Sequence, residues 1–193
     1  MKVPGRFEEH ECTFITWPCF TDLEINFFEQ EIVSFVEKLS NYEKVVIISD
    51  PSNYSKAKLF CNNIASIFSI PTDWSWIRDN GPIFIKNSDE SIEAIHFDFN
   101  AWGEKYSPCN TVKEMPRLLL EKMKIKRHFS NLILEGGGVT FDGKGTMVTT
   151  EQMLLNNNRN SNYTKKDIEN EVKKLLGIEK VIWLKKGLFE DIG

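Results

Sequence analysis

Long apolar runs are missing from the sequence. No stretch is long enough to cross a bilayer, and the segment 1–5 lacks the apolar core of a signal peptide. A basic surface is missing as well, because the formal net charge is −4. We therefore expect neither a membrane nor a nucleic-acid partner, and we predict a cytoplasmic protein.

Cysteine and histidine are scarce. The four cysteines, at positions 12, 19, 61 and 109, include no CxxC pair, so we expect small buried thiols rather than disulfides. The three histidines show no metal-ligand spacing. His96 falls in an alternating apolar and polar segment and is interpreted as a residue on a strand surface. With 41% apolar and 27% charged residues, the chain has an ordinary globular composition, and its 193 residues suit one domain or part of a larger protein.

Strands and helices alternate along the chain without a linker. Strands are predicted at 13–17, 45–48, 83–85, 92–99, 131–134, 139–141, 147–150 and 181–184, with hairpin turns at 87–90 and 142–145. Helices are predicted at 22–39, 54–64 (capped from 50–53), 112–123 and 164–176. Thr164, Asp167 and Gly177 are expected to cap the last helix. The segment 122–127, which is rich in lysine and arginine, is interpreted as a solvated helix end. Strand, hairpin and helix recur at about sixty residues, which favours a radially repeated architecture.

Two short segments carry the chemistry. The first, 76–82 (Trp-Ile-Arg-Asp-Asn-Gly-Pro), and the second, 135–138 (Glu-Gly-Gly-Gly), each place an acidic residue beside a turn at a strand edge. Indole rings at Trp76 and Trp102 accompany Asp79 and Glu135. Carboxylates that neutralise a cation and rings that stack on it indicate a pocket for a planar organic cation such as a guanidinium. Each segment alone also has an ordinary interpretation, namely a turn at 79–82 and a bulge or a close backbone approach at 136–138.

The order of these segments closely resembles the family of agmatine deiminases and bacterial-type peptidylarginine deiminases. The resemblance covers nearly the whole chain and rests on segments 4–11, 16–18, 76–82, 99–106, 134–137, 154–160 and 181–184. It implies an α/β pentein fold, a propeller-like ring of five αβ modules, of which this chain covers about half. Residues 1–193 are accordingly expected to form a single incomplete domain that stops before the family's Gly-His-x-Asp segment and its C-terminal catalytic cysteine.

The resemblance also assigns roles to residues. Asp79 matches the aspartate that binds the guanidinium in catalysis, and Glu135 matches the acid of the Glu-Gly-Gly motif. Trp76 and Trp102 match rings that line the substrate channel, and Asp191 matches a further acidic contact, with Glu190 as the alternative. None of the four cysteines matches the nucleophile. Without their counter-charges, the two clustered carboxylates are expected to share a proton.

Three hypotheses follow from the resemblance. The first is a hydrolase that converts agmatine and water to N-carbamoylputrescine and ammonia, with arginine or peptidylarginine as the alternative substrate. The second is a guanidinium-binding fragment without catalysis, or a half that needs a complementing C-terminal partner chain. The third is a piece of an ordinary enzyme of about twice this length. A homo-oligomer is possible in each case, and no cofactor or metal is implied, because side chains carry the family's chemistry.

Overall fold

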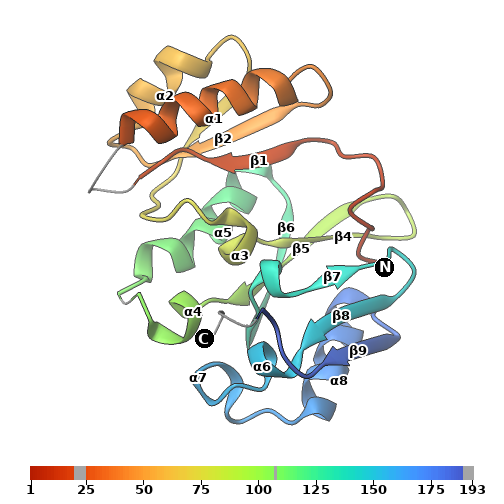
Figure 1. The fold of residues 1–193 in the computed structure, drawn as a ribbon. Coiled ribbons are helices and arrows are strands. Elements are labelled where there is room, and N and C mark those ends of the chain that lie inside the picture. The colour runs from red at the N-terminus through yellow and green to blue at the C-terminus, as the bar shows by residue number, and fades with distance from the viewer. Residues whose placement is uncertain (20–24, 107, 189–193) are drawn as a thin grey trace. The chain divides into compact units, whose positions relative to one another are not determined.

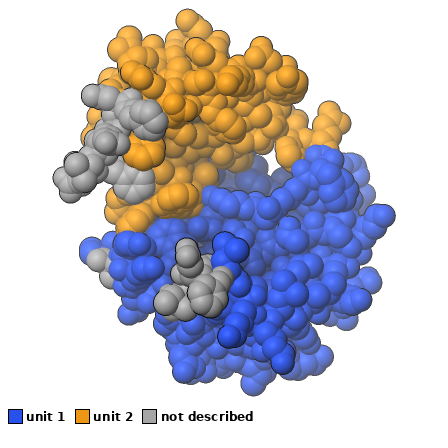
Figure 2. Space-filling view, viewed as in Figure 1, with its two compact units in different colours: residues 1–8, 78–193 blue, residues 9–77 orange. Residues whose placement is uncertain are grey.

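The computed structural model describes residues 1–19, 25–106 and 108–188. The chain forms two compact units (Figure 2). Each unit has a hydrophobic core of its own. Unit 2 comprises residues 9–77, and unit 1 comprises residues 1–8 and 78–193. Within the described residues, no helix has both the length and the apolar composition that a membrane span requires.

Unit 2 is built on a parallel sheet in the order β1-β2-β3, formed by β1 (Thr13–Thr16), β2 (Val45–Ser49) and β3 (Ser66–Ser69). Two helices, α1 (Ile25–Leu39) and α2 (Tyr54–Cys61), connect the strands (Figure 1). All five residues of β2 are buried, which explains the unbroken β-branched run in the sequence. The core of this unit comprises Ile15, Trp17, Val36, Val45, Ile47, Ala57 and Cys61.

The predicted strands at 13–17 and 45–48 are confirmed, and the helix predicted over 22–39 is present from Ile25; its predicted start lies outside the described residues. Two details differ. Asn53 is the N-cap of α2 but makes no side-chain capping bond, and the helix ends at Cys61 rather than Ile64. Strand β3 was not predicted, because its serines give it no apolar pattern.

Unit 1 contains two sheets of the same design. In the first sheet, β4 (Ile83–Lys86) is antiparallel to β5 (Ile92–Asp98), and β5 is parallel to β6 (Lys126–Ile133). In the second sheet, β7 (Thr140–Phe141) is antiparallel to β8 (Thr146–Thr150), and β8 is parallel to β9 (Lys180–Leu184). The predicted internal repeat is therefore present, with a period of roughly 55 residues.

The long helix of each repeat joins the middle strand to the third strand. These helices are α5 (Asn110–Met123) and α8 (Lys165–Leu176), shown in green and blue in Figure 1. Ile168, Val172 and Leu176 form the buried stripe of α8. Its predicted capping box between Thr164 and Asp167 and its left-handed cap at Gly177 are confirmed.

Both sheets of unit 1 contribute to one hydrophobic cluster. Its residues come from the strands, from helix α8, from the other segments that connect the strands and from the N-terminal segment. They are Val3, Ile85, Ile95, Phe97, Leu132, Leu134, Val139, Met147, Leu154, Ile168, Val172, Leu176 and Ile178.

Two interpretations of the sequence are wrong in unit 1. Lys126 and Arg127 begin strand β6 instead of ending the helix, which stops at Met123 before a left-handed Lys124. His96 is buried, with 5% of its surface exposed. The alternation of apolar and polar residues around His96 wrongly predicted a strand with one face in solvent. Both faces of β5 are covered, so Ala94, Ile95, His96 and Phe97 are all buried.

Short helical turns follow the strands and carry the residues of the candidate site. They are α3 (Ile77–Asn80), α4 (Ala101–Glu104), the 3-10 turn η1 (Gly136–Gly138), α6 (Glu151–Leu154) and α7 (Asn157–Asn160).

Candidate active site

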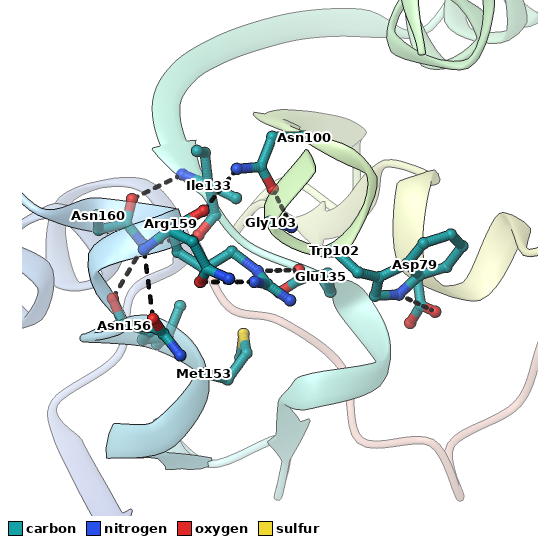
Figure 3. A network of polar contacts seen from close by, with 12 residues as sticks. Asp79, Asn100, Trp102, Gly103, Ile133, Glu135, Met153, Asn156, Arg159 and Asn160 are labelled. Carbon is teal, nitrogen blue, oxygen red and sulfur yellow. Dashed lines mark hydrogen bonds and ion pairs between the residues drawn. The ribbon is translucent and has the colours of Figure 1, made fainter. Parts of the chain in front are cut away.

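The carboxylate of Asp79 is held at both of its oxygens. Oδ1 accepts the backbone N–H of Gly137 at 3.0 Å. Oδ2 accepts the indole N–H of Trp102 at 3.1 Å, as Figure 3 shows. Asp79 lies in the short helix α3, not in the simple turn that the sequence alone allows. A Cβ atom at Gly137 would collide with Asp79 Oδ1, so glycine is required for this close approach. Three segments far apart in the sequence therefore fix the orientation of one carboxylate.

Trp102 is presented by a turn of left-handed backbone. The φ angles of Ala101, Trp102, Gly103 and Glu104 are 52°, 57°, 81° and 68°. A left-handed conformation costs a non-glycine residue roughly 1–2 kcal/mol, so the turn requires support from its surroundings. Asn100 supplies part of this support: its Oδ1 accepts the N–H of Gly103 at 2.9 Å, and its Nδ2 donates to the Asn158 carbonyl at 2.7 Å.

The ring of Trp102 contacts two other aromatic rings. Phe99 meets it edge-on with centroids 5.1 Å apart, and Tyr106 does so at 5.7 Å. The ring contacts hold the indole in place, and its N–H donates to Asp79. Trp102 therefore acts as a hydrogen-bond donor that orients the carboxylate. Stacking of Trp102 on a substrate cation stays a prediction.

Glu135 forms a buried ion pair with Arg159. Glu135 Oε1 accepts from Arg159 Nε at 2.6 Å, and the two side chains are only 4% and 6% exposed. Glu135 Oε2 is buried and has no hydrogen-bond partner among the described residues. Burial raises the pKa of the Glu135 carboxyl, and the charge and hydrogen bond of Arg159 oppose that rise. The negative charge of Asp79 adds to the rise in pKa.

Arg159 was not predicted, because the asparagine-rich segment 156–160 resembles a loop. The structure forms this segment into α7, with the Asn156 side chain accepting the N–H of Asn158. Asn160 anchors it: Oδ1 accepts the N–H of Ile133 at 3.0 Å, and Nδ2 donates to the carbonyls of Ile133 and Leu154 (Figure 3). The sequence offered one sign of a role for this residue, namely a single arginine within an asparagine-rich segment.

The structure brings three of the predicted site residues together in unit 1, namely Asp79, Trp102 and Glu135. Trp76 belongs to unit 2 and is 54% exposed, so its place in the site stays a prediction. Asp191 and the alternative Glu190 lie outside the described residues.

The described cysteines are free thiols, and three of them are poorly suited to nucleophilic attack. Burial raises the pKa of Cys12 and Cys19, and it raises that of Cys61 to about 11. Since the thiolate is the reactive form, these three side chains stay protonated and unreactive near neutral pH. Within residues 1–19, 25–106 and 108–188, no group of three or more His, Cys, Asp or Glu side chains is placed to hold a metal ion.

The chain is similar to deiminases over nearly its whole length. It is 31% identical over 200 residues to the agmatine deiminase of Pseudomonas aeruginosa strain LESB58, covering 98% of this chain and 54% of that protein. The structure of the agmatine deiminase of Enterococcus faecalis superposes with a TM-score of 0.92 at 26% identity, covering 96% of this chain and 53% of that one. The substrate-bound C315S agmatine deiminase of C. jejuni superposes with a TM-score of 0.82 at 31% identity, covering 97% and 56%.

These similarities confirm the predicted pentein fold, and the chain spans about half the length of the relatives it matches. The sequence model of the Porphyromonas-type peptidyl-arginine deiminases matches residues 2–192. The chain therefore belongs to the Porphyromonas-type peptidyl-arginine deiminase family.

Proposed function

We propose that this chain is the guanidinium-binding part of an agmatine deiminase-like hydrolase, which converts agmatine and water to N-carbamoylputrescine and ammonia. The observation that carries the proposal is the Asp79 carboxylate, which Gly137 and Trp102 hold from either side. A carboxylate of fixed orientation matches a planar guanidinium, because two parallel N–H groups can donate to its two oxygens.

Preorganisation is the contribution of these residues to the reaction. Asp79 is already oriented, so no rearrangement is needed when the cation binds. Glu135 would add a second carboxylate close to the delocalised cation. Trp76 and Asp191 are proposed as further contacts on the substrate.

The nucleophile is proposed to come from residues outside this sequence, either in a longer chain or in a complementing C-terminal chain. A cysteine thiolate would form a bond to the guanidinium carbon, and the C–N bond to the departing ammonia would break after protonation of the nitrogen. Water would then attack the thiouronium carbon, releasing the ureido product and the thiol. Residues 1–193 are accordingly proposed to form one incomplete domain, inactive alone, in a cytoplasmic enzyme of polyamine synthesis.

Agmatine is favoured as the substrate because the Pseudomonas, Enterococcus and C. jejuni relatives carry that name. Peptidylarginine is the alternative, since the family model is named after it. Turnover of each substrate by the full-length gene product decides between them. Release of ammonia from arginyl peptides but not from agmatine would contradict the assignment of agmatine.

Binding of agmatine to the chain tests the site without requiring turnover. We expect Asp79→Asn to weaken binding roughly tenfold or more, because a hydrogen-bonded charge pair contributes about 1.5–3 kcal/mol. Asp89→Asn is the matched control, since Asp89 is an exposed acid in the β4–β5 turn of the same unit and its substitution changes the net charge equally. Equal loss in both variants would point to general charge attraction and would contradict a site at Asp79.

The glycine turn gives a second test. Gly137→Ala is expected to weaken agmatine binding, because its Cβ would displace Asp79 Oδ1. Gly138→Ala is the control in the same turn, since the nearest atoms to its Cβ would be those of the flexible Met153 side chain. Similar affinities for the two variants would show that the Gly137 contact does not position Asp79.

A further inference from the structure

A cavity of about 360 Å³ lies in unit 2, and its wall is made by helices α1 and α2. Its size is within the range of small-molecule sites. Glu29, Gln30, Val33, Ser34 and Glu37 line it from α1, and Lys56 and Phe60 line it from α2. Its residues are distinct from those that surround Asp79.

Glu29 is the unusual member of this wall, because it is a nearly fully buried acid with an unsatisfied oxygen. Its side chain is 5% exposed, and Oε2 pairs with Lys56 Nζ at 2.6 Å. Oε1 is also buried but has no hydrogen-bond partner among the described residues. A buried polar atom without a partner costs about 1–3 kcal/mol. A donor from a ligand would remove that cost.

The order of side chains along α1 suggests the shape of the ligand. Glu29, Val33 and Glu37 are spaced at i, i+4 and i+8, so they lie on one face of the helix as acid, hydrocarbon and acid. The two acidic positions are separated by about 12 Å along the axis. Phe60, which is 50% exposed, adds an aromatic surface from α2.

We infer that this cavity binds a linear aliphatic diamine, with one ammonium donating to Glu29, the carbon chain lying against Val33 and Phe60, and the second ammonium near Glu37. Lys56 neutralises only part of the acidic charge that lines the cavity. The flexible hydrocarbon would be held by burial, and the two charged ends would set the preferred length. This site is independent of guanidinium binding at Asp79.

The test is an NMR titration of the isotope-labelled chain with 1,6-diaminohexane at neutral pH and constant ionic strength. We expect saturable shifts at Val33 and Phe60, with weaker binding of hexylamine and none of 1,6-hexanediol. Glu29→Gln should weaken diamine binding roughly tenfold or more. Glu37→Gln should reduce the affinity for the diamine to that for hexylamine. Glu31→Gln is the matched control, because Glu31 is an exposed acid of α1 that does not line the cavity.

Lys56→Met is an independent test, because it should change the affinity for the diamine in the opposite direction to Glu29→Gln. Removing the competing ammonium should make the diamine bind more tightly, so unchanged or weaker binding by the folded variant would overturn the inference. If Glu29→Gln fails to fold, Glu37→Gln at an exposed position still tests the inference, because an affinity for the diamine that stays above that for hexylamine would overturn it. Absence of saturable shifts, or equal weakening by Glu31→Gln, would also overturn it. Asp79→Asn should leave the shifts at Val33 and Phe60 unchanged. Their loss in Asp79→Asn would assign the diamine to the proposed active site instead.

Discussion

At the scale of single residues, the buried ion pair with Arg159 partly neutralises Glu135, the second carboxylate of the candidate site. We expect Arg159→Met to lower the free energy of unfolding by about 3–5 kcal/mol, because it leaves a buried carboxylate without its partner. The variant should also raise the pKa of Glu135 further, since Arg159 opposes the rise caused by burial. Urea denaturation at two pH values measures both effects.

The sign of the pH effect follows from linkage. A carboxyl whose pKa is higher in the folded state than in the unfolded state binds more protons when folded, so stability falls as pH rises between the two pKa values. Arg159→Met should therefore be more destabilising at pH 8 than at pH 5. Arg117→Met is the matched control, because its two ion pairs on α5 are exposed and contribute at most about 1 kcal/mol. If the two arginine variants lowered the free energy of unfolding equally, the buried ion pair would not be the source of the stability.

The sequence could predict the acids of the site but not their partners. Asp79 and Glu135 stand beside glycine-containing turns at strand edges, and that pattern is visible in the sequence. Arg159 was missed, because its partner is 24 residues away and no periodicity links the two. Trp102 was predicted as a ring for stacking, whereas the left-handed turn that directs its N–H to Asp79 depends on the backbone and on Asn100.

At the scale of elements, the two repeats of unit 1 end their long helices differently. Helix α8 ends at Gly177 with φ 68°, and α5 ends at Lys124 with φ 59°. Both positions are left-handed, where glycine has no steric cost. Lys124→Gly should therefore raise the free energy of unfolding by up to about 1 kcal/mol, as measured by urea denaturation. Lys122→Gly is the control within the right-handed part of α5 and should lower stability by about 1 kcal/mol. A loss of stability in Lys124→Gly would contradict this account.

Long elements were predictable because each has a period and a cap. Helix α8 has a buried stripe, a capping box and a terminal glycine, and all three could be predicted from the sequence. The one-turn helices α6 and α7 have no such period. They are formed by capping side chains such as Thr150 and Asn156, and α7 is also anchored by Asn160. Residues 126 and 127 were misassigned because strand β6 begins with exposed, charged side chains.

At the scale of the whole molecule, we expect the free energy of unfolding to fall in two stages as the pH is lowered. Carboxyls such as Asp142, Asp167 and Glu93 have a lowered pKa because they accept hydrogen bonds, so their stabilising effect is lost at the lowest pH values. The loss of stability that is due to His96 occurs at a higher pH. Burial and then the positive charge of Arg127 lower its pKa from 6.5 to about 4, against the opposing effects of Glu114, Asp98 and the Lys113 backbone.

The His96 stage can be isolated between pH 7 and pH 5. A histidine with a lower pKa in the folded state binds fewer protons there than in the unfolded chain, so stability is present above pH 6.5 and is lost as pH falls toward 4. A pKa shift from 6.5 to about 4 lowers the free energy of unfolding by about 2 kcal/mol between pH 7 and pH 5. His96→Gln should remove most of this pH dependence in urea denaturation. Ile95→Val, a neighbouring buried change without a titrating group, should lower stability by the same amount at both pH values. If His96→Gln retains the full pH dependence of the unsubstituted chain, the buried neutral histidine is not its source.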